Sequence, residues 1–368
     1  MLLKDFDRAK IEAQSCYEKR KCDIDFGILQ NFAENCSVTD MVVTEDGRVW
    51  VDKGEGLKEK STRVPLSNPS VLREYSVWLC AQLGKRLDDA CPIADASSES
   101  GIRIHAVISP IVSKGAALSI RFPALQHYDL ATLSDIGMMP KEILLVLEKL
   151  VKMRANILIT GSTGSGKTTL MKALLAAANA QDRIVSVEEV RELGNIAVHH
   201  VSLSVREANV EGAGAVGLPQ LVKATLRMRP DRIILGECRG EEIADLLRVF
   251  TSGHHGGMTT LHADEVDRVP ARLMALGLLA GLKPEALCSL SAGAFDVIIH
   301  VQRAIDGKRY IRELGVLQSI NGGEVLKGIS ILRVNKDSKH MSIEIFPEWN
   351  IFAKKWGLCK SSNSVCKV

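Results

Sequence analysis

Residues Gly161-Ser162-Thr163-Gly164-Ser165-Gly166-Lys167-Thr168 fit the pattern G-x-x-x-x-G-K-[ST] in full. They lie between an apolar run at 157–159 and a segment with helical spacing at 170–178, which is the context that this motif requires. Its glycines let backbone N–H groups surround phosphate oxygens at a helix N-terminus. Lys167 is suited to neutralise β- and γ-phosphate charge, and the hydroxyl of Thr168 to ligate Mg²⁺. The motif, with Thr169 beside it, therefore predicts a nucleoside triphosphate site rather than a merely glycine-rich turn.

The chain beyond Pro140 alternates apolar strands with helical segments. Four of its apolar runs are short and nearly continuous, and they lie at 157–159, 184–187, 233–235 and 258–260. Strands of this kind are buried on both faces, as in a parallel sheet covered by helices. We therefore predict an α/β domain over residues 140–333, with a mainly parallel sheet and helices on both of its faces.

Two acidic residues follow strands of this predicted sheet. Glu237 ends the run 233–237, and Glu188 is the first acid beyond the strand at 184–187. Because the carboxyl ends of parallel strands meet at one edge, both acids are expected beside the phosphate loop. A carboxylate is needed there to hold the metal or to orient a water molecule. An acid after a strand is usually an ordinary loop charge, but two of them in one such domain favour the functional interpretation.

A histidine- and glycine-rich stretch surrounds the last of these strands. It reads Gly253-His254-His255-Gly256-Gly257-Met258-Thr259-Thr260-Leu261-His262. A polar histidine at a strand end is able to sense or polarise the γ-phosphate. Spacing alone, however, does not single out His262 as catalytic.

Residues 25–123 predict a separate α+β domain. Asp46-Gly47 between two apolar segments predicts a β-hairpin, because Asp-Gly readily supplies the positive φ of a tight turn. Two later strands place Arg103 and Arg121 on their polar faces. A solvated sheet face explains these arginines as well as a functional role does.

The remaining segments carry weaker patterns. Residues 1–24 predict a short helical region, and residues 124–139 a linker with little periodicity. Residues 334–368 form a predicted C-terminal extension that is polar and aperiodic apart from 343–346, and the sequence assigns it no role.

Composition limits the class of protein. The chain has 368 residues, with 47 Lys and Arg against 44 Asp and Glu, a net charge of +3 that is ordinary for a globular protein. No apolar run approaches the roughly 18–20 residues of a membrane span, and residues 1–7 become charged too soon for a signal peptide. Nine cysteines without a Cys-x-x-Cys pair favour reduced thiols over a metal site. We therefore expect a soluble, unsecreted protein of two or three domains.

Four ordered segments resemble the Walker A, Asp box, Walker B and His box of type II/IV secretion ATPases. They are residues 161–170, 183–193, 226–240 and 251–264. Within that superfamily, residues 208–214 and 226–232 most resemble the tight-adherence (Tad/Flp) pilus assembly ATPases. The resemblance covers about residues 25–333 and includes the strands around Arg103 and Arg121.

The resemblance implies a homohexamer that hydrolyses ATP with Mg²⁺. In such a ring a RecA-like domain and the PAS-like N-terminal domain of an adjacent subunit clamp the nucleotide. Matched to the family motifs by position, Lys167 and Thr168 would bind phosphate and Mg²⁺. The resemblance makes Glu188 the general base and gives Glu237 the role of supporting the metal and water. It places His262 against the γ-phosphate region.

Several arginines also match family positions. Arg103 and Arg121 match N-terminal-domain arginines that reach the nucleotide across the ring interface, where an arginine finger meets charge developing in the transition state. Arg206, Arg227 and Arg239 match further arginines, and an ion pair within the domain explains each of these equally well.

The resemblance also implies a place of action. It predicts a motor for Tad/Flp-type pilus assembly, peripheral on the cytoplasmic face of the inner membrane and working on integral platform proteins. The alternatives are a conjugation-type type IV secretion ATPase and a nucleotide-gated scaffold with little turnover. The charge of +3 weighs against direct nucleic acid binding. Ser162, where glycine is common, and Glu189, in place of an Asp, depart from the family pattern.

Overall fold

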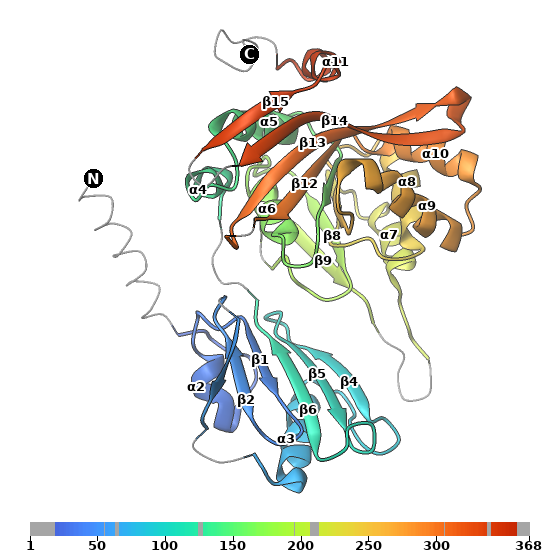
Figure 1. Cartoon of the computed structure of the whole chain (residues 1–368). Helices are drawn as coiled ribbons and strands as arrows, with labels where there is room; N and C mark the ends of the chain where they lie inside the picture. Colours follow the sequence, from blue (N-terminus) through green and yellow to red (C-terminus); the bar gives the residue numbers. More distant parts are fainter. Residues whose placement is uncertain are drawn as a thin grey trace. The chain divides into compact units, whose positions relative to one another are not determined.

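The structure, a computed structural model, divides the chain into two compact units, Met1–Gln126 and His127–Val368 (Figure 1). It describes residues 19–54, 56–62, 66–123, 128–194, 196–206, 213–304, 306–336 and 340–358. Most of the predicted helical region 1–24, the motif residues 207–212 and the chain beyond 358 lie outside these ranges. No helix in the described ranges is long and apolar enough to cross a membrane.

The first unit is a six-stranded antiparallel sheet in the order β3-β2-β1-β6-β5-β4. Its strands are β1 (Asp40–Val43), β2 (Val49–Asp52), β3 (Leu57–Lys60), β4 (Ile93–Ser97), β5 (Arg103–Ile108) and β6 (Ala116–Arg121). Its helices are η1 (Gly27–Leu29), α2 (Gln30–Ala33) and α3 (Pro69–Gln82). Asn68 caps α3 by accepting a hydrogen bond from the backbone N–H of Ser70, and Leu72 and Leu79 of this helix are buried in the core of the unit.

The hairpin predicted around Asp46-Gly47 is confirmed, since β1 and β2 pair antiparallel across that turn. Gly47 has a φ of +82°, and a Cβ there would lie 2.3 Å from the backbone of Leu66. Glycine is therefore required at this position both by the turn and by the close packing behind it.

The second unit is a nine-stranded sheet in the order β15-β14-β13-β12-β7-β11-β10-β8-β9. Its strands are β7 (Ile157–Thr160), β8 (Ile184–Glu188), β9 (His200–Ser204), β10 (Arg232–Leu235), β11 (Met258–Leu261), β12 (Val297–Arg303), β13 (Arg309–Ile320), β14 (Val325–Lys336) and β15 (Met341–Ile345). Strands β12, β7, β11, β10, β8 and β9 run parallel, and β13, β14 and β15 are added antiparallel at one side.

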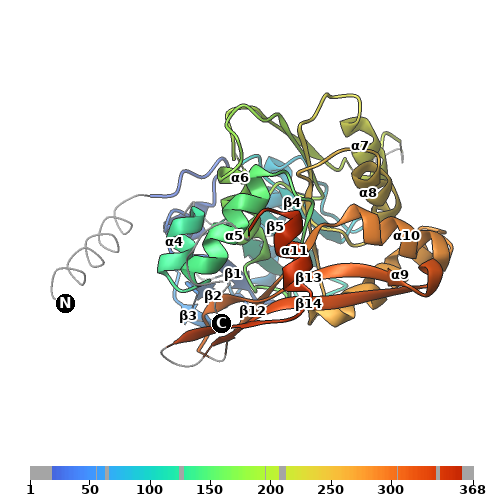
Figure 2. The same cartoon turned by 90° about the horizontal axis from the view of Figure 1, so that it is seen from above.

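Helices cover both faces of this sheet, as predicted. The helical elements are α4 (Leu130–Asp135), α5 (Lys141–Lys152), α6 (Lys167–Ala176), α7 (Leu218–Thr225), α8 (Glu242–Thr251), η2 (Val266–Arg268), α9 (Val269–Leu279), α10 (Pro284–Ala294), η3 (Asn321–Gly323) and α11 (Trp349–Lys355). Side chains of α4, α5, α6 and α11 share one apolar core, and those of α7 to α10 share another. Figure 2 shows α4, α5 and α6 grouped apart from α7 to α10. Along β7, Ile157 and Ile159 enter the first core and Leu158 the second.

The structure extends this unit past the boundary expected at residue 333, which falls within β14. Strand β15 pairs antiparallel with β14, and α11 buries Trp349, Phe352 and Trp356 in the same core as α5 and α6. These aromatic residues are spaced three and four apart, so they lie on one face of a helix. Residues 334–358 are thus part of the sheet and core of this unit.

A buried ion pair joins the strands at the sheet edge where β8 and β10 begin. Asp182 accepts hydrogen bonds from Arg232 (2.7 Å) and Arg154 (2.5 Å), and Arg232 also donates to the Val151 carbonyl at the end of α5 (2.9 Å). Burial acts to raise the pKa of Asp182, but the two arginines outweigh it and hold that pKa below its usual value.

Asp182→Ala is expected to lower the free energy of unfolding by about 3–5 kcal/mol at neutral pH, because it leaves the charge of Arg232 buried and poorly compensated. Because the pKa of Asp182 is lowered, its contribution is complete above the unfolded pKa of about 3.9 and is lost as the pH falls through the folded value. Urea unfolding of Asp182→Ala, beside the exposed control Asp46→Ala, measures the effect. Equal, small losses in both variants would contradict it.

Candidate nucleotide site

The phosphate loop lies between β7 and α6, as its sequence predicts. Gly164 and Gly166 have φ values of +73° and +99°, so the loop uses backbone conformations that favour glycine. A Cβ at Gly161 would lie 2.3 Å from the Val301 carbonyl oxygen, whereas one at Gly164 would meet nothing within 4 Å. The loop is therefore packed tightly against β12 at its start and open at its middle, at the N-terminus of α6.

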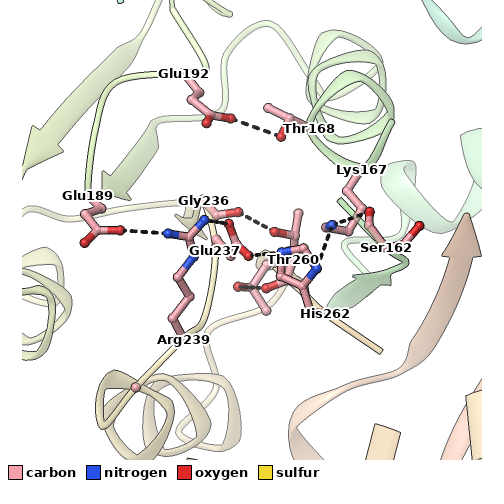
Figure 3. Close-up of polar contacts among 12 residues, drawn as sticks. Ser162, Lys167, Thr168, Glu189, Glu192, Gly236, Glu237, Arg239, Thr260 and His262 are labelled. Carbon is pink, nitrogen blue, oxygen red and sulfur yellow. Dashed lines mark hydrogen bonds and ion pairs between the residues drawn. The ribbon is translucent and has the colours of Figure 1, made fainter. Parts of the chain in front are cut away.

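Lys167 is the buried cation of this loop. Its Nζ donates hydrogen bonds to the carbonyl oxygens of Gly161 (2.9 Å) and Ser162 (3.0 Å), and lies 3.5 Å from Nδ1 of His262 (Figure 3). Burial lowers the pKa of Lys167, and Glu237 opposes that effect.

The strand order explains why His262 and Glu237 lie beside the loop. Strand β11 is next to β7, and β10 follows β11, so the residues after these parallel strands meet at one edge of the sheet. Nε2 of His262 lies 2.6 Å from Oε1 of Glu237. Burial, and then the charge of Lys167, lower the pKa of His262, which favours a neutral imidazole at neutral pH. The structure thus brings together three of the residues that the sequence nominates.

Glu188 occupies a more enclosed position at the end of β8. Its Oε1 accepts hydrogen bonds from the backbone N–H groups of Glu192 (2.8 Å) and Leu193 (2.9 Å), and its Oε2 is buried without a hydrogen-bond partner in the described structure. Burial raises the pKa of Glu188, although the two N–H groups act in the opposite direction. In this arrangement Glu188 fixes the segment that follows it.

Two residues of the site were not nominated as catalytic from the sequence. The Thr168 hydroxyl donates a hydrogen bond to Oε2 of Glu192 (3.2 Å), within the Asp box. Arg239 donates hydrogen bonds to Glu237 (2.7 Å) and to Glu189 (3.3 Å) (Figure 3). Arg239 therefore forms ion pairs within its own domain, one of the two explanations that the sequence allowed for it. The acidic character of residues 188–192 was the available signal for Glu192, but only the path of the loop shows which acid meets Thr168.

Other sequence candidates lie elsewhere. Arg103 and Arg121 are opposite each other on β5 and β6 of the first unit, where Asp40 lies 3.8 Å from Arg121. Their part in a nucleotide site remains a prediction. His254 and His255 precede β11, so they lie at the sheet edge opposite to His262.

Comparison with known proteins now assigns the family. Residues 23–309 match the model of the family described as "Type II/IV secretion system protein", which is more than half of the chain. The chain belongs to this family. It is therefore a P-loop ATPase of the type II/IV secretion superfamily, as the resemblance of its four motifs predicts.

The similar proteins come from secretion and conjugation systems. A protein of Mycobacterium tuberculosis named "Putative conjugal transfer protein" is 41% identical over 302 residues, covering 80% of this chain and 85% of that protein. The type IV secretion system protein PtlH of Bordetella pertussis is 30% identical over 316 residues, a match that covers 77% of this chain and 91% of PtlH. The structure of the ATPase DotB from Legionella pneumophila shares the fold, with a TM-score of 0.53 and 20% identity over 76% of this chain and 77% of that one. These names do not specifically support the tight-adherence pilus subgroup.

Proposed function

We propose that this secretion ATPase drives a conjugation-type type IV secretion machine by hydrolysing ATP. The observation that supports hydrolysis is the meeting of Lys167, Glu237 and His262 at one sheet edge beside the phosphate loop. Support for the type of machine comes from the 41% and 30% identical relatives, which are named for conjugal transfer and type IV secretion.

Oxygen ligands suitable for Mg²⁺ lie beside the loop. Thr168 and Glu192 are in contact there, and Glu237 lies across the site. Hydroxyl and carboxylate oxygens are the ligands that Mg²⁺ prefers, so Thr168 and Glu237 fit the ion that the family implies. When bound, Mg²⁺ would neutralise phosphate charge. The chain itself would hold the phosphates through Lys167 and the loop N–H groups, and orient water with its acids.

The water-orienting acid is proposed to be Glu192 rather than Glu188. Glu192 is partly exposed and contacts Thr168, whereas Oε2 of Glu188 is buried away from solvent. Glu192→Gln is expected to reduce kcat about 100-fold or more while ADP binding persists, because an amide cannot act as a base. Steady-state kinetics and ADP titration measure this.

Glu188→Gln is the matched comparison for this prediction. It is expected to lower the melting temperature as well as activity, since Glu188 anchors the backbone of Glu192 and Leu193. Full activity in Glu192→Gln, together with a stable but inactive Glu188→Gln, would instead assign the base to Glu188, as the family resemblance implies.

The proposed assembly is a homohexamer in which Arg103 and Arg121 of one subunit complete the site of its neighbour. It would act on integral platform proteins as a peripheral protein of the inner membrane, without direct nucleic acid contact. Native mass measured with and without ATP tests the hexamer.

The tight-adherence pilus remains the second candidate, on the sequence of residues 226–232. Deleting the gene in its host separates the two. Loss of conjugal or protein transfer with surface pili retained supports the secretion machine, and loss of pili alone contradicts it.

A purified protein that binds ATP without hydrolysing it would favour the alternative of a nucleotide-gated scaffold with little turnover.

A further inference from the structure

Arg309, the first residue of β13, contacts the phosphate loop although it lies far outside the motif. Its Nε donates a hydrogen bond to the Gly164 carbonyl oxygen, 2.8 Å away and 145 residues earlier in the chain. Its Cδ lies 3.1 Å from the position that a Cβ on Gly166 would take. The side chain therefore crosses the loop between two of its glycines, and its charged end group hydrogen-bonds to the backbone there.

The same hairpin also supports the start of the loop. The Val301 carbonyl of β12 lies against Gly161, where it leaves no space for a Cβ. The residues that precede Val301 and Gly161 are also in contact, since Nδ1 of the buried His300 is 3.1 Å from the hydroxyl of Thr160, the last residue of β7. Strands β12 and β13 thus contact the phosphate loop at its first, fourth and sixth positions.

Strand β13 is itself anchored near His262. Buried Glu313, four residues after Arg309, pairs with Arg333 of β14 at 2.6 Å and accepts a 3.4 Å hydrogen bond from the Val266 N–H. A Cβ at Gly315 would lie 2.4 Å from a methyl group of Val266. Because Val266 follows His262 closely in the chain, one strand braces both the phosphate loop and the segment after the histidine.

The geometry points to Arg309 as a positioning residue of the nucleotide site. The loop must present its N–H groups to phosphate, so its carbonyl groups face away and need other partners. Arg309 supplies a charge-assisted partner to Gly164, and such bonds are stronger than neutral ones. Arg309 therefore holds the loop in the conformation that binds the nucleotide. This inference rests on the proposed nucleotide site.

Arg303 provides a matched control on the same hairpin. It pairs directly with Arg309 across the two strands and is also exposed, but its Nε donates to Gly307 in the hairpin turn (3.2 Å) rather than to the loop. An arginine that only stabilises the hairpin would behave like Arg303.

The test compares Arg309→Met, Arg309→Ala and Arg303→Met with the wild type. The methionine variant keeps the stem over Gly166 and removes the hydrogen bond and charge. Titration with a fluorescent ADP analogue is expected to show about 10- to 100-fold weaker binding in both Arg309 variants, since a hydrogen bond to a charged group is lost. The KM for ATP should rise similarly and kcat fall less than about threefold, because binding rather than chemistry is affected. Arg303→Met should match the wild type.

Thermal unfolding without nucleotide checks that the variants fold, as expected for an exposed side chain. ADP affinity in Arg309→Met within about twofold of the wild type would overturn the proposal, and so would an equal loss in Arg303→Met. A wild-type protein that binds no ADP would instead overturn the proposed nucleotide site itself.

Discussion

Lys167→Ala is expected to abolish nucleotide binding and ATP hydrolysis together. Lys167 is the cation at the centre of the phosphate loop, where it bonds to two loop carbonyls and lies beside His262. Its substitution removes a preorganised positive charge from a buried site, where such groups contribute about 100- to 1,000-fold to the rate. ATP turnover and ADP titration of the purified variant measure both losses.

The control for this prediction is Lys149→Ala, which removes an exposed lysine from α5. It should leave turnover and binding unchanged. If Lys167→Ala retained more than about a tenth of wild-type turnover with normal ADP affinity, the loop would not be the hydrolytic site.

The parts of the fold that the sequence predicts correctly are those with short-range signals. The strand, loop and helix around 157–178 carry buried apolar residues, glycines and a helical pattern in one continuous stretch. Strands β7, β10 and β11 have four consecutive buried residues each, so their apolar runs are unambiguous. By contrast, β13 and β14 mix buried and exposed residues over twelve positions without strict alternation, and the sequence did not reveal them.

The same distinction applies to the site. The location of Glu237 and His262 could be predicted, because an acid or histidine at the end of a parallel strand must lie at the loop edge of the sheet, whereas the role of His262 was implied only by the family resemblance. The contact of Glu192 with Thr168 depends on the course of the segment after β8. The contact of Arg309 with Gly164 depends on a hairpin that joins the sheet 145 residues later. Neither contact follows from local pattern, because each requires the tertiary arrangement of a separate element.

Mixing two inactive variants is expected to restore ATP hydrolysis if Arg121 acts across a subunit interface. Arg121→Ala keeps an intact phosphate loop, and Lys167→Ala keeps an intact Arg121 on its separate N-terminal unit. Arg121→Ala alone should lose about 10³-fold or more in turnover, as expected for a missing arginine finger, and Lys167→Ala alone should lose about 100- to 1,000-fold or more, which is of the same order. In randomly mixed hexamers about one interface in four joins an intact loop to an intact arginine, so about a quarter of wild-type activity should return.

The control mixture pairs Lys167→Ala with Glu237→Gln. Both residues lie in the same unit of one chain, within a site linked through His262, so no interface in that mixture regains both. Rescue should therefore appear only with Arg121→Ala. Native mass spectrometry establishes that mixed rings form, and mixed rings of Lys167→Ala and Arg121→Ala without recovered turnover would exclude Arg121 as a residue acting in the neighbouring site. Mixing Lys167→Ala with Arg103→Ala tests in the same way whether Arg103, which lies opposite Arg121 on the neighbouring strand, acts in the neighbouring site.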